Sequence, residues 1–230
     1  MTRARPNLVA LYWLATLALA ATALVVVFTW TPTEQTMGPV QKIFYLHFPV
    51  AINALLACTV NFIACLAYLF TRRQRWDDLA AAAAGVAVLL CSIVLLTGMI
   101  WGREAWGHWW TWSPRLTFSL LLWLLYAAYL VIRSSFDDPT RRALICAVYG
   151  IVAFIDVPLV YFSVRLMPDI HPSSVSLEPA MWWTVLIFAV PVTMLAAGLI
   201  AAHYRLGRSH NLAQPDAASP RAVTSAGAIE

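Results

Sequence analysis

The sequence predicts an all-α, polytopic membrane protein with six transmembrane helices and both termini in the cytoplasm. Three observations predict this fold class: the composition, the length of the apolar segments and the distribution of basic residues. Of the 230 residues, 61% are hydrophobic and 11% are charged, whereas soluble proteins average about 45–50% apolar and about 25% charged residues. The chain therefore belongs in a bilayer, in contact with membrane lipid.

Six apolar segments are long enough to cross the bilayer, because about 20 helical residues span about 30 Å of hydrocarbon. They cover residues 8–30, 45–70, 79–100, 116–132, 143–164 and 181–204. The first is longer than the apolar part of a signal peptide and lacks a cleavage pattern after it, so we expect it to be retained. Residues 1–208 form the predicted membrane domain, and residues 209–230, rich in Ala, Ser and Pro, a disordered cytoplasmic tail.

The basic residues set the predicted orientation, because Lys and Arg in short loops favour the cytoplasmic side. Eleven of the 15 fall on the side of the termini, and the other four are Lys42, Arg103, Arg115 and Arg165. The loops after the first, third and fifth helices therefore face outward. The dispersed arginines do not form the clustered basic face of a nucleic-acid-binding protein, so we predict no nucleic-acid partner.

The four cysteines, Cys58, Cys65, Cys91 and Cys146, all lie inside predicted helices and form no C-x-x-C pair. Buried free cysteine behaves as a small hydrophobic residue. This pattern argues against thiol chemistry, a structural zinc site and covalent haem attachment.

Residues 101–112, which we call the Trp segment, form the third loop and concentrate tryptophan. This segment holds five of the chain's 11 tryptophans: Trp101, Trp106, Trp109, Trp110 and Trp112. An aromatic belt at the membrane surface is one interpretation. The alternative is a platform for a flat ligand, since glycines between the indoles let the backbone bend and approach it closely.

Two outward-facing histidines favour the platform. His47 opens the second helix and His171 precedes the sixth. A lone histidine at a helix end is most often an ordinary surface group, but a metalloporphyrin takes one imidazole on each face. Indoles provide flat walls for such a ring. Zinc is a weaker candidate because it takes three or four protein ligands.

Cations for the propionates of a haem are available on the same side. Arg103, Arg115 and Arg165 all face outward in the predicted topology, and guanidinium groups bind carboxylates well. His108, inside the Trp segment, is a candidate third ligand or a substitute ligand. The residues together predict a haem site on the outer side.

The remaining polar residues have predicted structural roles. Ser113 followed by Pro114 is a typical helix start, with serine as the N-cap. Asp156 lies in an apolar helix near a proline, where it either bonds donors around the kink or serves function. Asn53 and Asn61 are expected to form hydrogen bonds between helices.

These residues resemble the haem exporter protein C (CcmC) family of bacterial cytochrome c maturation. Its WWD motif is similar to Trp106-Gly-x-Trp109-Trp110-x-Trp112-x-x-Arg115-Leu-Thr117, and its first histidine motif to Tyr45-Leu-His47-Phe-Pro49-Val-Ala51. Its second histidine looks like His171, and the resemblance covers residues from about 12 to 204. The aspartate of the motif is Ser113 in this chain, so a good N-cap remains but a negative charge is lost.

The resemblance implies that haem b lies at the periplasmic face of the inner membrane, with His47 and His171 as axial ligands of the iron and the Trp segment against the ring. It also implies that the protein presents haem to the chaperone CcmE and is not an enzyme. The implied further partners are the ATP-binding-cassette transporter CcmAB and the small membrane protein CcmD.

The sequence leaves two alternative functions. A permease would move haem or another small substrate through the bundle, with Asp156 near the path, but the first, third and fourth helices offer few polar residues to line it. A cytochrome b-type oxidoreductase needs histidines at mid-helix depth, and no predicted helix carries a buried histidine pair. The sequence therefore favours a haem site at the outer surface over both a permease and an oxidoreductase.

Overall fold

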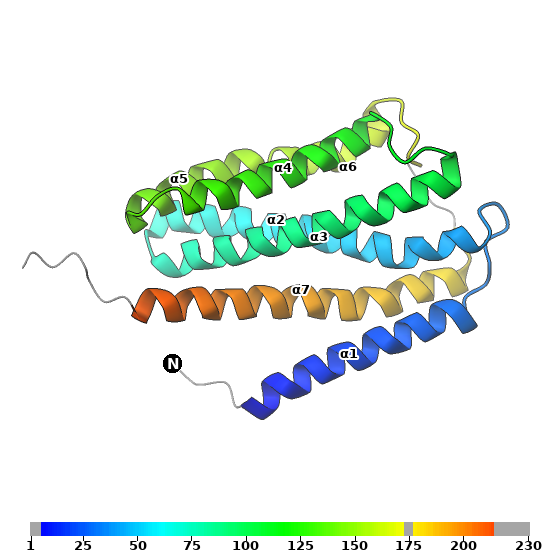
Figure 1. The fold of residues 1–230 in the computed structure, drawn as a ribbon, viewed down its shortest axis with the longest axis horizontal. Helices are drawn as coiled ribbons and strands as arrows, with labels where there is room; N and C mark the ends of the chain where they lie inside the picture. Colours follow the sequence, from blue (N-terminus) through cyan, green and yellow to red (C-terminus); the bar gives the residue numbers. More distant parts are fainter. Residues whose placement is uncertain (1–5, 173–176, 214–230) are drawn as a thin grey trace, which may run out of the picture.

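The computed structural model describes residues 6–172 and 177–213, which form a bundle of long helices (Figure 1). Six helical segments are long and apolar enough to cross a membrane, which confirms the six spans expected of an all-α membrane protein. One span, Pro139–Leu166, consists of two shorter helices. The elements are α1 (Pro6–Thr29), the 3-10 helix η1 (Pro39–Gln41), α2 (Lys42–Thr71), α3 (Gln74–Trp106), α4 (Pro114–Ser134), α5 (Pro139–Ala153), α6 (Asp156–Leu166) and α7 (Pro179–Ala213).

The centre of the bundle is the pair α2 and α3, which pack through small side chains. The buried small residues include Ala57, Cys58, Ala64 and Cys65 on α2 and Ala80, Ala83, Ala84 and Ala87 on α3. Small residues let membrane helices approach closely, which increases their van der Waals contact. All four cysteines are free and buried. This agrees with their predicted role as apolar packing residues.

Two asparagines of α2 tie this centre to its neighbours. Asn61 donates to the Ala80 carbonyl of α3 at 2.8 Å. Asn53 donates to the hydroxyl of Thr193 on α7 at 3.1 Å. The prediction of hydrogen bonds between helices is therefore confirmed for both residues.

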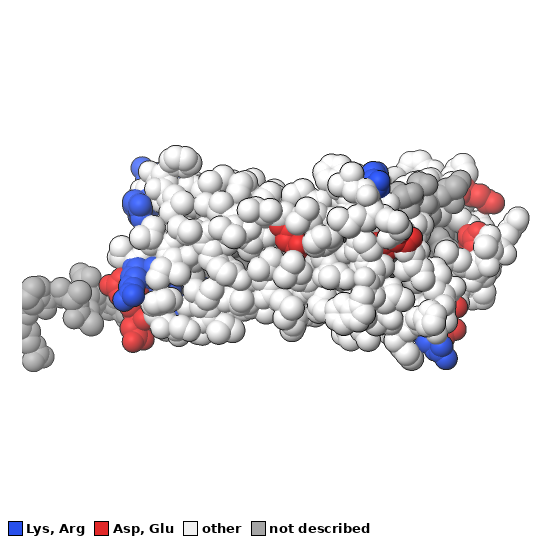
Figure 2. Space-filling model, turned by 90° about the horizontal axis from the view of Figure 1, so that it is seen from above, with Lys and Arg blue, Asp and Glu red and all other residues white. Residues whose placement is uncertain are grey.

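The other helices surround this pair, with α7 and then α1 on one side and α4, α5 and α6 on the other (Figure 1). On the face seen in Figure 2, charged side chains gather mainly toward the two ends of the bundle, with a long, largely uncharged stretch between. Leucines such as Leu11, Leu14 and Leu17 are more than 60% exposed. Such a surface suits lipid hydrocarbon.

The described chain begins and ends at the same end of the bundle, which we call the termini end (Figure 1). The opposite end, which we call the pocket end, carries the start of α2, the end of α3 and the start of α4. The helix α7 runs to Ala213, so residues 209–213 of the predicted tail are helical. Residues 214–230 of that tail lie outside the described residues.

The Trp segment is a loop only in its second half, because α3 continues to Trp106 instead of ending near residue 100. Gly102 lies inside the helix and does not interrupt it. The helix ends at Gly107, which has a φ of 78° and donates its N–H to the Arg103 carbonyl. This left-handed conformation suits glycine and closes the helix. Trp101 and Trp106 therefore stand on a helix.

The fifth span breaks at Phe154 and Ile155, between α5 and α6. Pro158 lies in the first turn of α6, and its missing N–H removes one helical hydrogen bond across the break. Asp156 begins α6 and is 3% exposed. Both of its carboxyl oxygens lack a hydrogen-bond partner among the described residues, so the first of the two alternatives for Asp156, bonds to donors around the kink, is not formed there.

Candidate functional site

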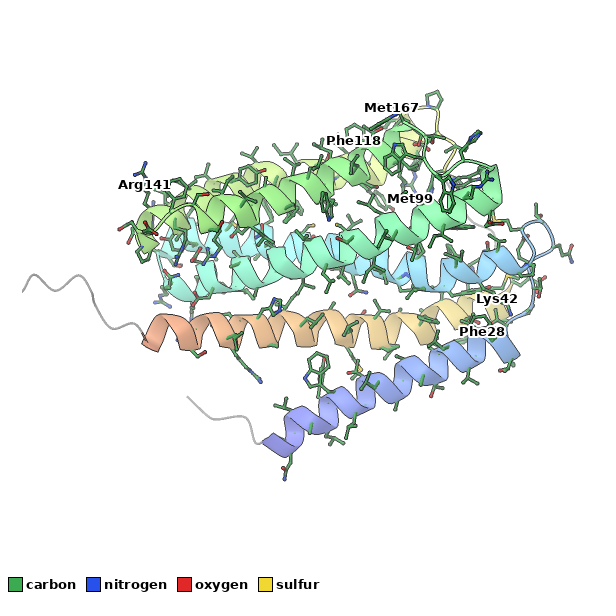
Figure 3. All side chains as sticks on the ribbon, viewed as in Figure 1. Phe28, Lys42, Met99, Phe118, Arg141 and Met167 are labelled. Atoms are coloured by element: carbon green, nitrogen blue, oxygen red, sulfur yellow. The ribbon has the colours of Figure 1, made fainter. Side chains whose placement is uncertain are left out.

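A pocket of about 170 Å³ lies at the pocket end of the bundle, among α2, α3, α4 and α6. Figure 3 shows Met99, one of its lining residues, at this end and Arg141 at the opposite end. Most of the lining side chains are apolar. Six residues expected from the sequence to bind haem also line it: His47, His171, Trp101, Trp106, Trp110 and Arg115.

His47 is held in one orientation by a helix other than its own. It lies near the start of α2, and its Nδ1 is 2.8 Å from the hydroxyl of Thr97 on α3. That hydroxyl donates its own proton to the Ile93 carbonyl at 2.7 Å, so it accepts a proton from Nδ1. The Nε2 atom of His47 therefore keeps its lone pair. Histidines that bind metals are commonly fixed in this way through their second nitrogen.

Gly98 leaves room for the His47 ring. A Cβ atom at this position would lie 3.3 Å from Cε1 of His47. With alanine at this position, the ring would have to shift by a few tenths of an ångström. Sequence reasoning missed both Thr97 and Gly98, since nothing in their local pattern shows that α3 brings them against His47.

His171 lies after α6, and its ring has the same arrangement of protons. Its Nδ1 is 3.0 Å from the Pro172 carbonyl oxygen. A carbonyl only accepts, so Nδ1 carries the proton and Nε2 is free to bind a metal. Burial lowers the pKa of His171, and the charge of Arg115 lowers it further. Both effects favour the neutral imidazole, which is the form that ligates iron.

Two indoles on α3 connect the two histidines. The Trp101 ring lies 5.7 Å from the His47 ring, and the Trp106 ring lies 6.3 Å from the His171 ring, measured between centroids. The indoles are 6.4 Å apart, with 25° between their planes. They form a nearly continuous aromatic wall. The indole N–H groups of Trp101 and Trp110 are buried without a partner among the described residues.

Four other expected residues stand outside the pocket lining. Trp109 and Trp112 are 57% and 75% exposed. Arg103 donates to the Gly107 carbonyl at 2.5 Å. Arg165 stacks on the ring of Tyr161 at 4.9 Å. These placements divide the Trp segment into indoles that face the pocket and indoles that face outward.

Arg115 and His108 also occupy different environments. Arg115 lines the pocket and donates to the Tyr161 carbonyl at 3.0 Å, so a cation borders the apolar cavity. His108 is exposed in the loop after α3 and is not among the lining residues. The His47 and His171 pair is therefore brought to one cavity, while His108 is not.

This arrangement fits a planar tetrapyrrole better than a bare metal ion. Within residues 6–172 and 177–213, no three His, Cys, Asp or Glu side chains come together as a metal site. A porphyrin supplies four nitrogens itself and needs only axial ligands from the protein. Two free imidazole nitrogens, an aromatic wall and one arginine meet those needs.

Comparison with known proteins gives consistent matches. The family model described as Heme exporter protein C matches residues 1–214. A Heme exporter protein C of Bradyrhizobium diazoefficiens is 34% identical over 76% of this chain and 69% of its own length. The protein of the same name from Paracoccus denitrificans is 31% identical over 73% and 70%, and that from Escherichia coli is 28% identical over 67% and 64%. The chain belongs to the Heme exporter protein C family.

Proposed function

We propose that the pocket binds haem b and that the protein is a non-enzymatic haem-handling component of cytochrome c maturation. The observation that carries this proposal is that the two imidazoles have the same protonation and hydrogen-bonding pattern. His47 and His171 line one pocket, and each directs a protonated Nδ1 to an acceptor, which leaves Nε2 free. The iron would lie between these two nitrogens. The name of the family supports haem as the cargo.

The other pocket residues have complementary roles in this proposal. Trp101 and Trp106 present apolar ring faces to the porphyrin, which excludes water from the iron ligands. Arg115 places a cation at the edge of the pocket, where a propionate binds. The unpartnered indole N–H of Trp110 provides a further donor to a bound polar group.

We further propose that the pocket faces the periplasm from the inner membrane and passes its haem to the chaperone CcmE, in a complex with CcmAB and CcmD. His47 stands on a helix and is held by Thr97 of another helix. His171 stands outside the helices, and its ring bonds the carbonyl of the next residue. A histidine of the chaperone therefore displaces His171 more easily than His47.

A transfer assay tests this proposal. Haem-loaded protein in detergent is mixed with the soluble domain of the chaperone, and the two are separated before haem is measured on each. We expect haem to move to the chaperone, and not to a chaperone variant without its acceptor histidine. Haem that stays on the membrane protein while CcmAB and CcmD are also present would contradict the proposed transfer.

A permease that carries haem through the bundle fits the structure less well. Asp156, which that alternative places near the path, does not line the pocket. Buried residues of the central pair, including Ala54 and Cys91, line the pocket. A site at one end of the bundle suits a protein that presents its cargo there.

The Thr97 hydroxyl gives a first testable prediction. Thr97→Val keeps the shape of the side chain but removes the acceptor for Nδ1 of His47. We expect haem affinity to fall about 10–100-fold, as when other partners of metal-binding histidines are removed. Haem titration followed by absorbance measures this change.

Two further variants serve as controls for Thr97→Val. Thr97→Ser keeps the hydroxyl and is expected to retain most of the affinity. Thr22→Val alters an exposed threonine of α1 that bonds only within its own helix. Equal affinity in Thr97→Val and the unchanged protein would refute the role given to this hydroxyl.

A further inference from the structure

The first turn of α4 lacks the cap that its sequence predicts. Ser113 occupies the N-cap position with an extended backbone, and Pro114 follows at the first helical position. Its side chain, however, makes no capping hydrogen bond. The Ser113 hydroxyl is buried and has no partner among the described residues. Another group must therefore satisfy the N–H groups of this helix start.

That group is the carboxylate of Asp169, which comes from the segment after α6. Its Oδ2 atom accepts the backbone N–H of Arg115 at 2.7 Å. Arg115 is the second residue of α4, so this N–H is one that the helix itself leaves unpaired. A negative charge at this position also interacts favourably with the helix dipole. The cap of α4 is thus supplied by a residue 54 positions later in the sequence.

The second oxygen of the same carboxylate holds the segment that carries His171. Oδ1 of Asp169 accepts the backbone N–H of His171 at 2.8 Å. The His171 ring then bonds the Pro172 carbonyl. One side chain therefore joins the start of α4, directly after the Trp segment, to the backbone of the second pocket histidine.

We propose that Asp169 is a positioning residue that fixes His171 as a ligand of haem. The proposal rests on the haem-binding function proposed above. Asp169 acts through the two backbone N–H groups and does not touch the iron. Its carboxylate also places a negative charge at the start of α4, where Ser113 has none. This charge comes from the segment that carries His171. Asp169 thereby fixes the position of His171 relative to the Trp segment.

The test separates capping from ligand positioning. Asp169→Ala removes both hydrogen bonds, and the double variant Ser113→Asp/Asp169→Ala returns a carboxylate to the start of α4 only. We expect Asp169→Ala to weaken haem binding about tenfold or more and to shift bound haem from a six-coordinate, low-spin to a high-spin spectrum. We also expect its melting temperature without haem to fall.

In the double variant, we expect the melting temperature to recover while the high-spin spectrum and weak affinity remain. Asp169→Asn, which keeps an acceptor oxygen but loses the charge, is expected to be intermediate. Glu104→Ala, an exposed acidic residue at the same end, is expected to behave like the unchanged protein.

Two results would overturn the proposal. An unchanged spectrum and affinity in Asp169→Ala would show that His171 needs no such support. Full recovery of the low-spin spectrum in the double variant would show that Asp169 acts only as a cap of α4 and does not position His171. If the unchanged protein binds haem and the His47→Ala variant does not, either result contradicts the role of Asp169 but leaves the proposed haem-binding function intact. If haem binding is independent of His47, the proposed function itself fails.

Discussion

Replacing either His47 or His171 by alanine is expected to abolish the six-coordinate, low-spin spectrum of bound haem and to lower the amount of haem that copurifies at least about tenfold. Each substitution removes one axial bond, and the remaining imidazole leaves the iron five-coordinate or bound by water. Absorbance spectra and haem content per mole of protein, measured on protein from haem-replete cells, check this expectation.

Two other histidines provide matched controls. His108 is exposed in the loop after α3, outside the pocket lining. His203 lies in the C-terminal part of α7, against Gly85 of α3. His108→Ala and His203→Ala are expected to keep the spectrum of the unchanged protein. Loss of the low-spin spectrum in His108→Ala, with both pocket variants unaffected, would contradict the assignment of the axial ligands.

The second large effect is expected within the Trp segment itself. Trp106→Ala removes half of the aromatic wall and the ring beside His171. Loss of an aromatic contact of this size costs about 1.5–3 kcal/mol, which corresponds to about 10–150-fold weaker haem binding. Trp109→Ala changes a side chain that is 57% exposed and outside the pocket lining. Its haem affinity is expected to stay within about twofold of the unchanged value.

Haem titration of both tryptophan variants in the same detergent gives the comparison. Circular dichroism of each variant checks that the helices are intact. Similar losses in Trp106→Ala and Trp109→Ala would show that the whole segment contacts haem, as the sequence alone implies. A larger loss in Trp109→Ala would contradict the wall described here.

The six membrane spans were predictable because they depend on composition averaged over about 20 residues. The residues at which the spans end were less predictable. The expected boundary near residue 100 followed the end of the apolar stretch, but the α3 backbone continues through Gly102 to Trp106. Hydropathy reports where apolar residues end, whereas a helix ends where its hydrogen bonds end. The break between α5 and α6 was indicated by Pro158 but not located.

The site was predictable as a set of residue types and not as an arrangement. His47 and His171 stand out in the sequence because both lie on the outer side of the predicted topology, and the structure brings them to one pocket. The sequence does not show which indoles face the cavity, because this depends on the unexpected extension of α3. Thr97 and Asp169 acquire their roles through tertiary contacts. Only Asp169 had a local signal, its position two residues before His171.

The most direct test of the haem site is the position of the iron in the haem-loaded protein, determined by electron cryomicroscopy in nanodiscs. We expect the iron to lie between Nε2 of His47 and Nε2 of His171, with the porphyrin against Trp101 and Trp106. Iron bound by His108, or a haem lodged at the termini end near His203, would contradict this account.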